Sequence, residues 1–564
     1  MSGLVSGTDT PYDQSVGFSP SGTSSGGGSK GAIAAQFAAD DAARTNVLNR
    51  ARLCAQLTDP SLLPPLGQIE DQKLPENYQS VGSNGLTNIE GKMLLALFPP
   101  DRPWFVQELA PQIKFAPVPP EAIGLWEQAL FLQDLVAMAT LESANPDSRD
   151  EYGGDVAGFR TVQRQSISQT IATGDSLERL DDDYRISVFR RDQYVTRRDS
   201  CCRVLYHIIR ETLDPLSIGQ KQCDMAKLDW SSLMKKPAID RLCPMHTRVE
   251  WHPISKRWVI EQELHGVVIN TSEEKYSPFF STPFKLSPGE HYGRGLIERN
   301  LGDLRSLDEL AKRQLDFAEL ASKMLPALDY ASEVKPENLA ADSGKPFRAR
   351  VLNGVIQDVA MFKVDKLADF TVVEKIVERI ERRLSKALLT ESGSVRDSER
   401  TTAFEVSEVT LKELEGGLGG VYAPISDKKQ VPLVNRLFYQ LRRDNIIQTV
   451  APGTVKVRTL TGIAALARQA QAARLLKIAD VVKLLGDEAI ARLNVDVFLD
   501  VFARMQGGYE PNLIKSTAQV KIERQQAIAL AAQHAATQKA IDVAGNVVEN
   551  NATQQPQTIE QAVA

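Results

Sequence analysis

Residues 292 to 309, Tyr-Gly-Arg-Gly-Leu-Ile-Glu-Arg-Asn-Leu-Gly-Asp-Leu-Arg-Ser-Leu-Asp-Glu, open a long amphipathic helix. Apolar residues recur at helical spacing from here to about Lys323, namely Leu296, Ile297, Leu301, Leu304, Leu307, Leu310, Ala311 and Leu315. At a rise of about 1.5 Å per residue, such a helix is about 40 Å long. We therefore predict that it spans a whole domain.

A second long helix is predicted from about Lys366 to Leu389. Its Glu378 precedes Arg382 by four residues, which favours an ion pair, and one face is apolar, with Val373, Ile376, Val377, Ile380, Leu384 and Leu388. Residues 325–364, between the two helices, contain three prolines and a short apolar run at 351–356. This composition predicts loop and small sheet, so the central pattern is helix, excursion, helix.

The segment before these helices indicates an α+β fold that is mainly α. Residues 41–143 have helical spacing, with a stop at Pro99-Pro100 and a further helix over 120–141. Between about residues 177 and 284 the apolar period becomes that of strands, and a polar turn at 253–256 separates two such runs. We predict an antiparallel hairpin or meander there, as a sheet lobe between helical regions.

After the second helix, residues 391–402 are polar and have no apolar face, which predicts an exposed loop. A helix from residue 403 is then predicted to resume at about Pro432 after a hinge made by Gly416, Gly417, Gly419 and Gly420. The Ala-rich residues 461–543 predict helical hairpins. Residues 1–40 and 544–564 have few large apolar side chains, and we expect both ends to be disordered.

The composition argues against several classes of protein. With 564 residues, 42% hydrophobic and 24% charged, the chain can build more than one core. Its formal net charge of -6 argues against a sequence-specific DNA-binding protein, because no general positive field attracts nucleic acid. Five cysteines and no secretory signal suit a reducing cytoplasm. No apolar run approaches the roughly 20 residues needed to cross a bilayer.

No motif indicates catalysis or a bound cofactor. The phosphate-binding pattern Gly-x-x-x-x-Gly-Lys-Ser/Thr is absent, and Gly-Arg-Gly at 293–295 lacks the βαβ context of a dinucleotide site, so it predicts the turn before a helix. The three aspartates at 181–183 are predicted as a solvated turn rather than a cation site. A zinc site is not expected either, because its possible ligands do not form two paired clusters: Cys223, Cys243, His246 and His252. We expect no enzyme activity, metal or cofactor.

Seven short blocks occur in a characteristic order along the chain. They are Gly85-Leu-Thr-Asn88, the run from Lys92 to Pro99, Tyr292-Gly-Arg294, the run from Leu301 to Leu307, Ala368-Asp-Phe-Thr371, Arg400-Thr-Thr-Ala403 and Leu418-Gly-Gly-Val-Tyr422. Together these blocks resemble the portal, or head-to-tail connector, proteins of short-tailed bacteriophages. The resemblance extends over most of the chain from about residue 45 to 520, and the joint occurrence of the blocks is specific although each alone is weak.

The resemblance implies an architecture for the predicted segments. Members of this family form a ring of about twelve copies at one capsid vertex, in which neighbouring copies meet head to tail. By this analogy the chain divides into a wing at 41–290, a first stem helix at 291–324, a clip at 325–364, a second stem helix at 365–390, a channel loop at 391–402, a kinked wing helix at 403–460 and a crown at 461–543. The ring would be the conduit through which double-stranded DNA is packaged and ejected, in the virion at the portal vertex after assembly in the host cytoplasm.

The resemblance also implies partners and candidate contact residues. A separate packaging ATPase (terminase) and later tail adaptor proteins would dock on the clip, where Lys345, Arg348 and Arg350 are candidates, while major capsid and scaffold proteins would surround the ring. In the channel loop, we expect transient phosphate contacts from two basic residues, weakened by nearby acids: Arg396, Arg400, Asp397 and Glu399. An alternative is that both arginines are simply paired with Glu399 or with wing residues.

Two other classes of protein stay open at this point. A helical scaffold or assembly protein without a DNA channel would explain the two long helices but not the ordered set of blocks. A membrane-associated pore is less consistent with the sequence, which has no spanning segment and no strongly basic amphipathic helix.

Overall fold

The computed structural model describes most of the chain between residues 31 and 460. The described residues are 31–68, 71–99, 103–114, 120–144, 158–322, 325–328, 351–352, 355–356, 359–362, 367–390, 422–451, 453–460 and short helical pieces between 475 and 539. They fall into two compact units. Unit 1 comprises residues 1–53, 189–277 and 286–293, and unit 2 comprises residues 54–188, 278–285 and 294–564.

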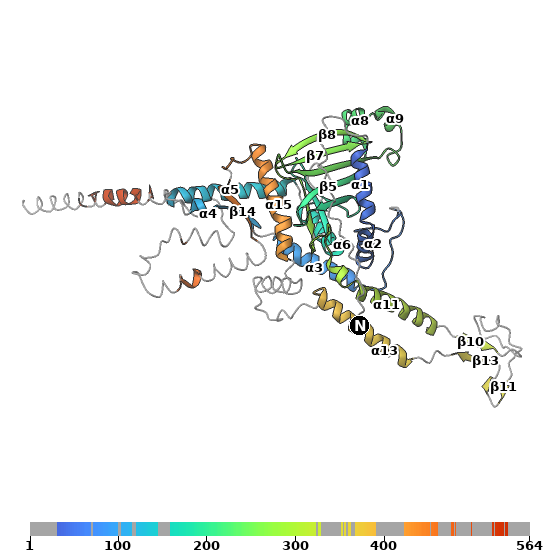
Figure 1. Ribbon diagram of the computed structural model, residues 1–564. Coiled ribbons are helices and arrows are strands. Elements are labelled where there is room, and N and C mark those ends of the chain that lie inside the picture. Colours follow the sequence, from blue (N-terminus) through green and yellow to red (C-terminus); the bar gives the residue numbers. More distant parts are fainter. Residues whose placement is uncertain are drawn as a thin grey trace, which may run out of the picture. The chain divides into compact units, whose positions relative to one another are not determined.

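Unit 1 is built on a five-stranded antiparallel sheet with the strand order β4-β5-β6-β7-β8 (Figure 1). Its strands are β4 (Tyr194–Arg198), β5 (Val204–Leu213), β6 (Cys243–His252), β7 (Arg257–Leu264) and β8 (Val267–Glu274). The predicted turn at 253–256 joins β6 to β7, and beside it Trp251 and Trp258 form a cross-strand pair with ring centroids 5.4 Å apart. The antiparallel meander predicted from the sequence is therefore confirmed. Three short helices separate β5 from β6: α7 (Pro215–Ile218), α8 (Gln220–Met225) and α9 (Trp230–Met234).

Helix α1 (Ala32–Ala43) packs on this sheet. Its Ile33 and Phe37 are buried in a cluster with Val195 and Ile208 of the strands. The N-cap, Gly31, provides no side-chain cap, and instead the carboxylate of Glu263 accepts hydrogen bonds from the backbone N–H groups of residues 33 and 34 at 2.9 and 3.2 Å. A carboxylate at this position complements the positive end of the helix dipole. The prediction of disorder through residue 40 is therefore wrong for residues 32–40, because contacts distant in sequence stabilise this helix.

Unit 2 has a core of helices packed on short strands. Its elements outside the long helices described below are α3 (Val81–Leu97), β1 (Phe105–Leu109), α4 (Pro111–Lys114), α5 (Pro120–Ala144), α6 (Phe159–Thr173), β2 (Asp175–Leu180), β3 (Ile186–Phe189), β9 (Phe279–Pro283), α15 (Tyr422–Arg443) and β14 (Val455–Thr459). Helix α2 (Thr45–Gln56) leads into this unit. The sheet orders are β3-β2-β9 and β1-β14. As predicted, α3 ends immediately before Pro99, and Phe98 packs edge-on against Trp104 and Phe159.

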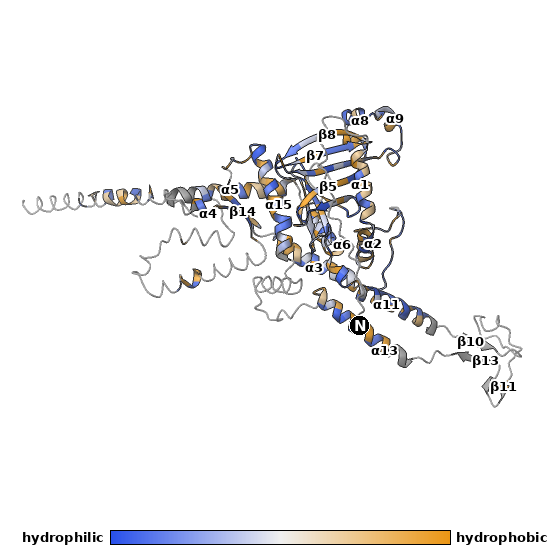
Figure 2. Ribbon diagram, in the orientation of Figure 1, coloured by the Kyte–Doolittle hydropathy of each residue, from blue (hydrophilic) through white to orange (hydrophobic). Residues whose placement is uncertain are grey.

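Two long helices leave this core as an antiparallel hairpin, formed by α11 (Leu301–Ser322) and α13 (Leu367–Ala387). Asp303 near the start of α11 pairs with Arg383 near the end of α13 at 2.5 Å, which fixes the antiparallel direction. Figure 2 shows hydrophilic and hydrophobic residues interspersed along both helices, as amphipathic spacing requires. Between them, β10 (Leu325–Leu328) pairs with β13 (Val359–Phe362), and β11 (Val351–Leu352) pairs with β12 (Val355–Ile356). The predicted helix, excursion, helix pattern is present.

The first long helix is not continuous from Tyr292, although the apolar spacing predicts one continuous helix. A short helix, α10 (Leu296–Arg299), comes first, and Asn300 ends it before α11 begins. Gly295 caps α10, and a Cβ at this position would lie 2.6 Å from the carbonyl oxygen of Ile171. The Gly-Arg-Gly turn thus brings the backbone of Gly295 close to that of Ile171 at the start of α10. Apolar spacing cannot reveal such an interruption, because α10 and α11 keep similar faces buried.

A second correction concerns Pro432, where the sequence predicts that the helix resumes after the glycine-rich stretch. Helix α15 begins ten residues earlier, at Tyr422, and contains Pro432 in its interior. Its apolar face is buried on both sides of the proline, with Ile425, Leu433, Val434, Leu437, Phe438 and Leu441. Interior proline costs a helix about 3 kcal/mol. Burial of this continuous face outweighs that cost.

None of the helices that the structure describes has both the length and the apolar character needed to span a bilayer.

Candidate functional site

The hairpin of α11 and α13 is the candidate functional site, and its two ends differ in burial. At the core end, which we call the hairpin base, Leu304, Leu307, Ile380, Leu384 and Leu388 are all buried. They share a cluster with residues of α3. Farther from the core, Leu315 of α11 is 58% exposed, and Val372 and Ile376 of α13 are 57% and 44% exposed. The hairpin is therefore anchored at one end and presents apolar side chains to its surroundings at the other.

A glycine of α3 permits the close packing at the hairpin base. A Cβ at Gly85 would lie 2.5 Å from Cδ1 and 2.8 Å from Cβ of Leu388. Contacts below about 3 Å essentially never occur between carbon atoms, since they lie far inside the optimal separation. Only glycine lets α13 approach α3 this closely.

Two polar side chains of α3 hold the end of α13. Leu389, which has a positive φ (55°), is the second residue after the end of the helix. Its carbonyl oxygen accepts hydrogen bonds from Asn88 Nδ2 at 2.6 Å and Lys92 Nζ at 3.0 Å, and the Thr390 hydroxyl donates to the Ser385 carbonyl at 3.0 Å. These bonds satisfy carbonyls that a helix end leaves open, and the Lys92 charge complements the negative end of the dipole. The base thus fixes the point from which residue 391 onward departs.

Helix α11 has its own polar ties to the unit 2 core. The backbone N–H of Tyr78 donates to Asp308 Oδ1 at 2.7 Å, and Lys312 Nζ lies 5.4 Å from the centre of the Tyr78 ring. The Asp303–Arg383 pair joins the two helices to each other, whereas Asp308 and Lys312 of α11 contact Tyr78. Within the helices, Arg305 pairs with Glu309 at 3.2 Å and Arg382 with Glu378 at 3.5 Å.

The hairpin is almost electrically neutral. The sequence of α11 holds five acidic and three basic residues, and that of α13 holds four acidic and five basic residues. Neutralising phosphates with lysine and arginine strengthens salt-sensitive binding to nucleic acid. A near-neutral surface of mixed charge does not hold a polyanion tightly.

A buried ion pair holds α15 against α6 and β2. Lys429 of α15 and Glu178 of β2 are in direct contact, and both side chains are almost completely buried. Lys429 Nζ also donates to the Ser166 hydroxyl at 2.7 Å, and Gln163 Nε2 donates to Glu178 Oε2 at 3.1 Å. Burial lowers the pKa of Lys429, while Glu178 opposes that shift. Removing one member of such a pair is costly because the other charge stays buried.

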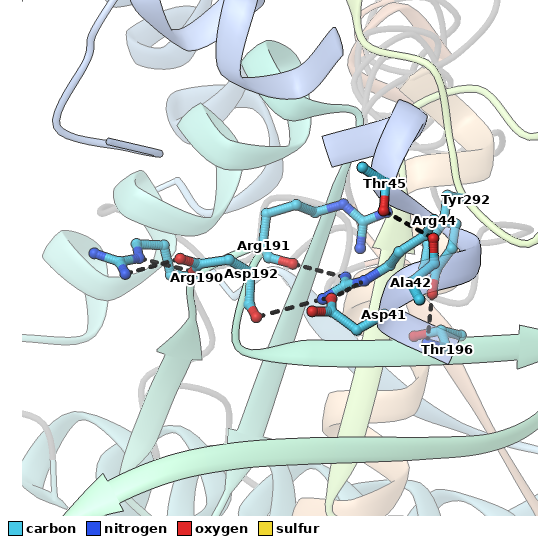
Figure 3. A network of polar contacts seen from close by, with 9 residues as sticks. All are labelled: Asp41, Ala42, Arg44, Thr45, Arg190, Arg191, Asp192, Thr196 and Tyr292. Carbon is cyan, nitrogen blue, oxygen red and sulfur yellow. Dashed lines mark hydrogen bonds and ion pairs between the residues drawn. The ribbon is translucent and has the colours of Figure 1, made fainter. Parts of the chain in front are cut away.

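Tyr292, where the amphipathic sequence opens, is a packing residue of unit 1. Figure 3 shows its ring beside two arginines. The guanidinium carbon of Arg191 lies 4.1 Å from the ring centre and that of Arg44 lies 5.8 Å from it. The Tyr292 hydroxyl accepts a hydrogen bond from the Thr196 N–H at 3.2 Å, and Arg44 donates to the Arg191 carbonyl at 2.9 Å. Burial lowers the pKa of Arg44, and the neighbouring Arg191 charge acts in the same direction.

The other sequence candidates have structural roles where the structure describes them. Asp181 accepts hydrogen bonds from the N–H groups of residues 183 and 185, which closes the turn between β2 and β3, and Asp182 pairs with Arg443 at 3.0 Å. Burial raises the pKa of the thiols of Cys223 and Cys243, which makes both poor nucleophiles. Within the described ranges, no three His, Cys, Asp or Glu residues are grouped as metal ligands.

The site residues predicted from the sequence lie outside the described residues and stay predictions. This holds for the channel-loop group at 396–400, the clip group at 345–350 and the glycines at 416–420. The hairpin base is absent from the sites predicted from the sequence. A signal for it is present, because Gly85, Asn88 and Lys92 are spaced by three and four residues and therefore share one face of α3. For the Lys429–Glu178 pair the sequence offers no signal.

Comparisons with known proteins give consistent matches. A family model described as "Bacteriophage head to tail connecting protein" matches residues 252–514. The chain is 28% identical to the portal protein of Escherichia phage T7 over 429 residues, which cover 74% of this chain and 76% of that protein. It is 29% identical to the portal protein of Enterobacteria phage T3 with the same coverage. It is 24% identical to the portal protein of Pseudomonas phage phiKMV over 473 residues, 82% of this chain and 88% of that protein.

The tight contact at the hairpin base predicts opposite effects for two glycines of α3. Gly85→Ala forces the new methyl group against Leu388 and should lower the free energy of unfolding by about 1 to 3 kcal/mol. Gly91→Ala is the matched control, because nothing lies within 4 Å of its Cβ position. This variant should be neutral or stabilise by up to about 1 kcal/mol through helix propensity. Thermal and urea unfolding measure both changes; equal effects of the two substitutions would contradict the close approach of α3 and α13.

Proposed function

The chain belongs to the portal, or head-to-tail connector, proteins of short-tailed bacteriophages, and from this membership we propose that it assembles into a ring of about twelve copies around a DNA channel. The observation that carries the proposal is the hairpin of α11 and α13. It is anchored by buried leucines at its base and exposes Leu315, Val372 and Ile376 farther out. In a closed ring each copy contacts two neighbours, and these apolar residues are suited to that contact.

The proposed ring gives each segment a place. Helices α11 and α13 form the stem, residues 325–364 the clip, residues 391–402 the channel loop, residues 41–290 and 403–460 the wing, and residues 461–543 the crown. The ring sits in the virion at one capsid vertex, surrounded by major capsid and scaffold proteins, after assembly in the host cytoplasm. The glycines at 416–420, between the channel loop and α15, act as a hinge.

Charge balance supports passage of DNA rather than its capture. Nine acidic and eight basic residues are distributed along the two stem helices, so a duplex meets little net attraction from them. The ring itself has no chemical step to perform. Movement of DNA is supplied by the packaging ATPase, which binds at the clip and is later replaced by tail adaptor proteins.

We predict that the purified protein forms rings visible by negative-stain microscopy, with a central hole wide enough for duplex DNA. Mass photometry should give a mass near twelve times the 62.1 kDa of one chain. Monomers or rods at all concentrations and salt conditions tested would instead favour a helical scaffold without a channel.

Channel-loop contacts predict a second phenotype. Arg396→Ala combined with Arg400→Ala removes the proposed transient phosphate contacts but leaves Asp397 and Glu399 in place. Heads assembled with this variant should retain packaged DNA less well, and the salt slope of duplex binding by rings should fall by about one for each phosphate that is no longer neutralised. Lys256→Ala with Arg257→Ala, at an exposed turn of unit 1, is the control. Normal packaging and retention by the channel-loop variant would show that both arginines are merely paired within the protein.

Docking at the clip predicts a third outcome, which separates assembly from motor binding. Lys345→Glu, Arg348→Glu and Arg350→Glu together should weaken binding of the purified packaging ATPase to rings at least tenfold, as should deletion of residues 336–346, while rings still form. Lys235→Glu, Lys236→Glu and Lys256→Glu, at three exposed lysines of unit 1, together control for the change in net charge. Unchanged ATPase and tail-protein binding by both clip variants would exclude this surface.

A further inference from the structure

Seven exposed charged residues of α13 are sorted by sign into two rows. The acidic row is Glu374, Glu378 and Glu381, and the basic row is Lys375, Arg379, Arg382 and Lys386. Within each row the spacing is three or four residues, so its members lie one above another on one side of the helix. All seven side chains are exposed. By helical rotation the two rows are centred about 100° apart.

The contacts of α13 within its own chain do not require this sorting. Ile380, Leu384 and Leu388 bury a third side of the helix at the hairpin base. Arg383, which belongs to neither row, makes the ion pair with Asp303 of α11. Across the rows, Glu378 and Arg382 approach to 3.5 Å, but both are more than half exposed, and such surface pairs contribute little.

The sorting works against the stability of the helix by itself. Like charges three or four residues apart on a helix repel each other, and every neighbouring pair within each row is of this kind, for example Glu374 with Glu378 and Lys375 with Arg379. An intermixed order of the same residues would place opposite charges at these spacings. The arrangement therefore indicates a partner that offers each row the opposite sign.

Exposed apolar residues lie beside the basic row. Val372 and Ile376 continue the same helix surface on the side away from the acidic row, and they are 57% and 44% exposed. Apolar side chains bordered by charge are typical of protein–protein interfaces, where the apolar part is buried and the charges form the rim. This favours a protein partner for the basic row over a polyanion, which would leave the apolar residues uncovered.

We infer that this partner is the next copy of the chain: the acidic row of one α13 lies against the basic row of the neighbouring α13. The inference rests on the proposed ring. Rotation about a ring axis moves a copy without changing its height, so groups that pair between neighbours lie at nearly the same level. The two rows satisfy this condition, because their members are adjacent in sequence (374 and 375, 378 and 379, 381 and 382), about 1.5 Å apart along the helix. A head-to-tail interface needs two complementary sides on each copy, and α13 has both.

Charge reversal tests the pairing. Variant A carries Glu374→Lys, Glu378→Lys and Glu381→Lys, so both rows are basic; variant B carries Lys375→Glu, Arg379→Glu and Arg382→Glu, so the basic row becomes mostly acidic. We expect each variant alone to lose at least nine-tenths of its rings at about 0.15 M salt, the ionic strength at which exposed charges still interact over about 8 Å. An equimolar mixture should restore rings in which A and B alternate, and a single chain with all six substitutions should also form rings.

A control variant separates pairing from a general effect of charge. Lys235→Glu, Lys236→Glu and Lys256→Glu together change three exposed charges of unit 1 and should leave rings intact. Rings from A alone and B alone would overturn the inference. The inference would also be overturned if neither the mixture nor the six-fold variant forms rings. A variant B that assembles normally but retains less DNA would overturn it too, and would assign the basic row to the channel. If the unchanged protein forms no rings, the proposed function fails instead.

A measurement on the unchanged protein guards against misfolding of the variants. Rings held by these rows should dissociate at least tenfold faster in 1 M than in 0.1 M sodium chloride, because salt screens exposed charge pairs. Circular dichroism confirms that A and B keep their helix content. Dissociation that is independent of salt would overturn the inference even if A and B do not fold.

Discussion

The contact between α3 and α13 at the hairpin base is the constraint on which the rest of the candidate site depends. A long two-helix hairpin that projects from a core has a defined direction only if its attachment is rigid. Here the attachment combines a glycine that admits Leu388, a cluster of buried leucines and two side chains that hold the carbonyl of Leu389. These contributions are concentrated at the end of α13, and a close-packed contact of this kind is sensitive to small changes in side-chain volume.

A buried ion pair of unit 2 likewise holds the chain on the other side of residues 391–421. The stretch that leaves α13 after residue 390 returns to the core at α15, and the Lys429–Glu178 pair lies in the first half of that helix. A desolvated pair tolerates little separation of its partners, since each buried charge depends on the other. The structure thus holds the chain firmly immediately before and shortly after residues 391–421. The sequence blocks that resemble the portal family include residues on both sides of this stretch, from Asn88 and Lys92 in α3 to Tyr422 at the start of α15.

Sequence periodicity predicted the elements whose stability is local or strongly amphipathic. The two long helices α11 and α13, the stop at Pro99 and the hairpin around residues 253–256 follow from spacing and turn residues alone. Three other features depend on partners far away in the chain and therefore do not follow from local spacing. Helix α1 depends on Glu263, and the path of α15 through Pro432 depends on a buried apolar face. The pairing of β1 with β14 depends on the register of Phe105 with Thr459. The spacing of Gly85, Asn88 and Lys92 indicates a shared face of α3, but it does not show that Leu388 and Leu389 are the residues packed against that face.

The charges of α13 show why composition alone understates what a helix can do. Counting residues gives a nearly neutral surface, which suits a channel through which a polyanion passes. Placing the same residues on the helix separates them into an acidic side and a basic side, and these have opposite consequences for a neighbouring copy. A helix with a net charge close to zero can still have two sides of opposite charge, because the net charge does not determine where the charged residues lie. One helix can therefore favour contact with the same helix of a neighbouring copy through short-range charge pairs. The same helix attracts DNA little, because attraction to DNA grows with the number of phosphates neutralised and the net charge of the helix is close to zero.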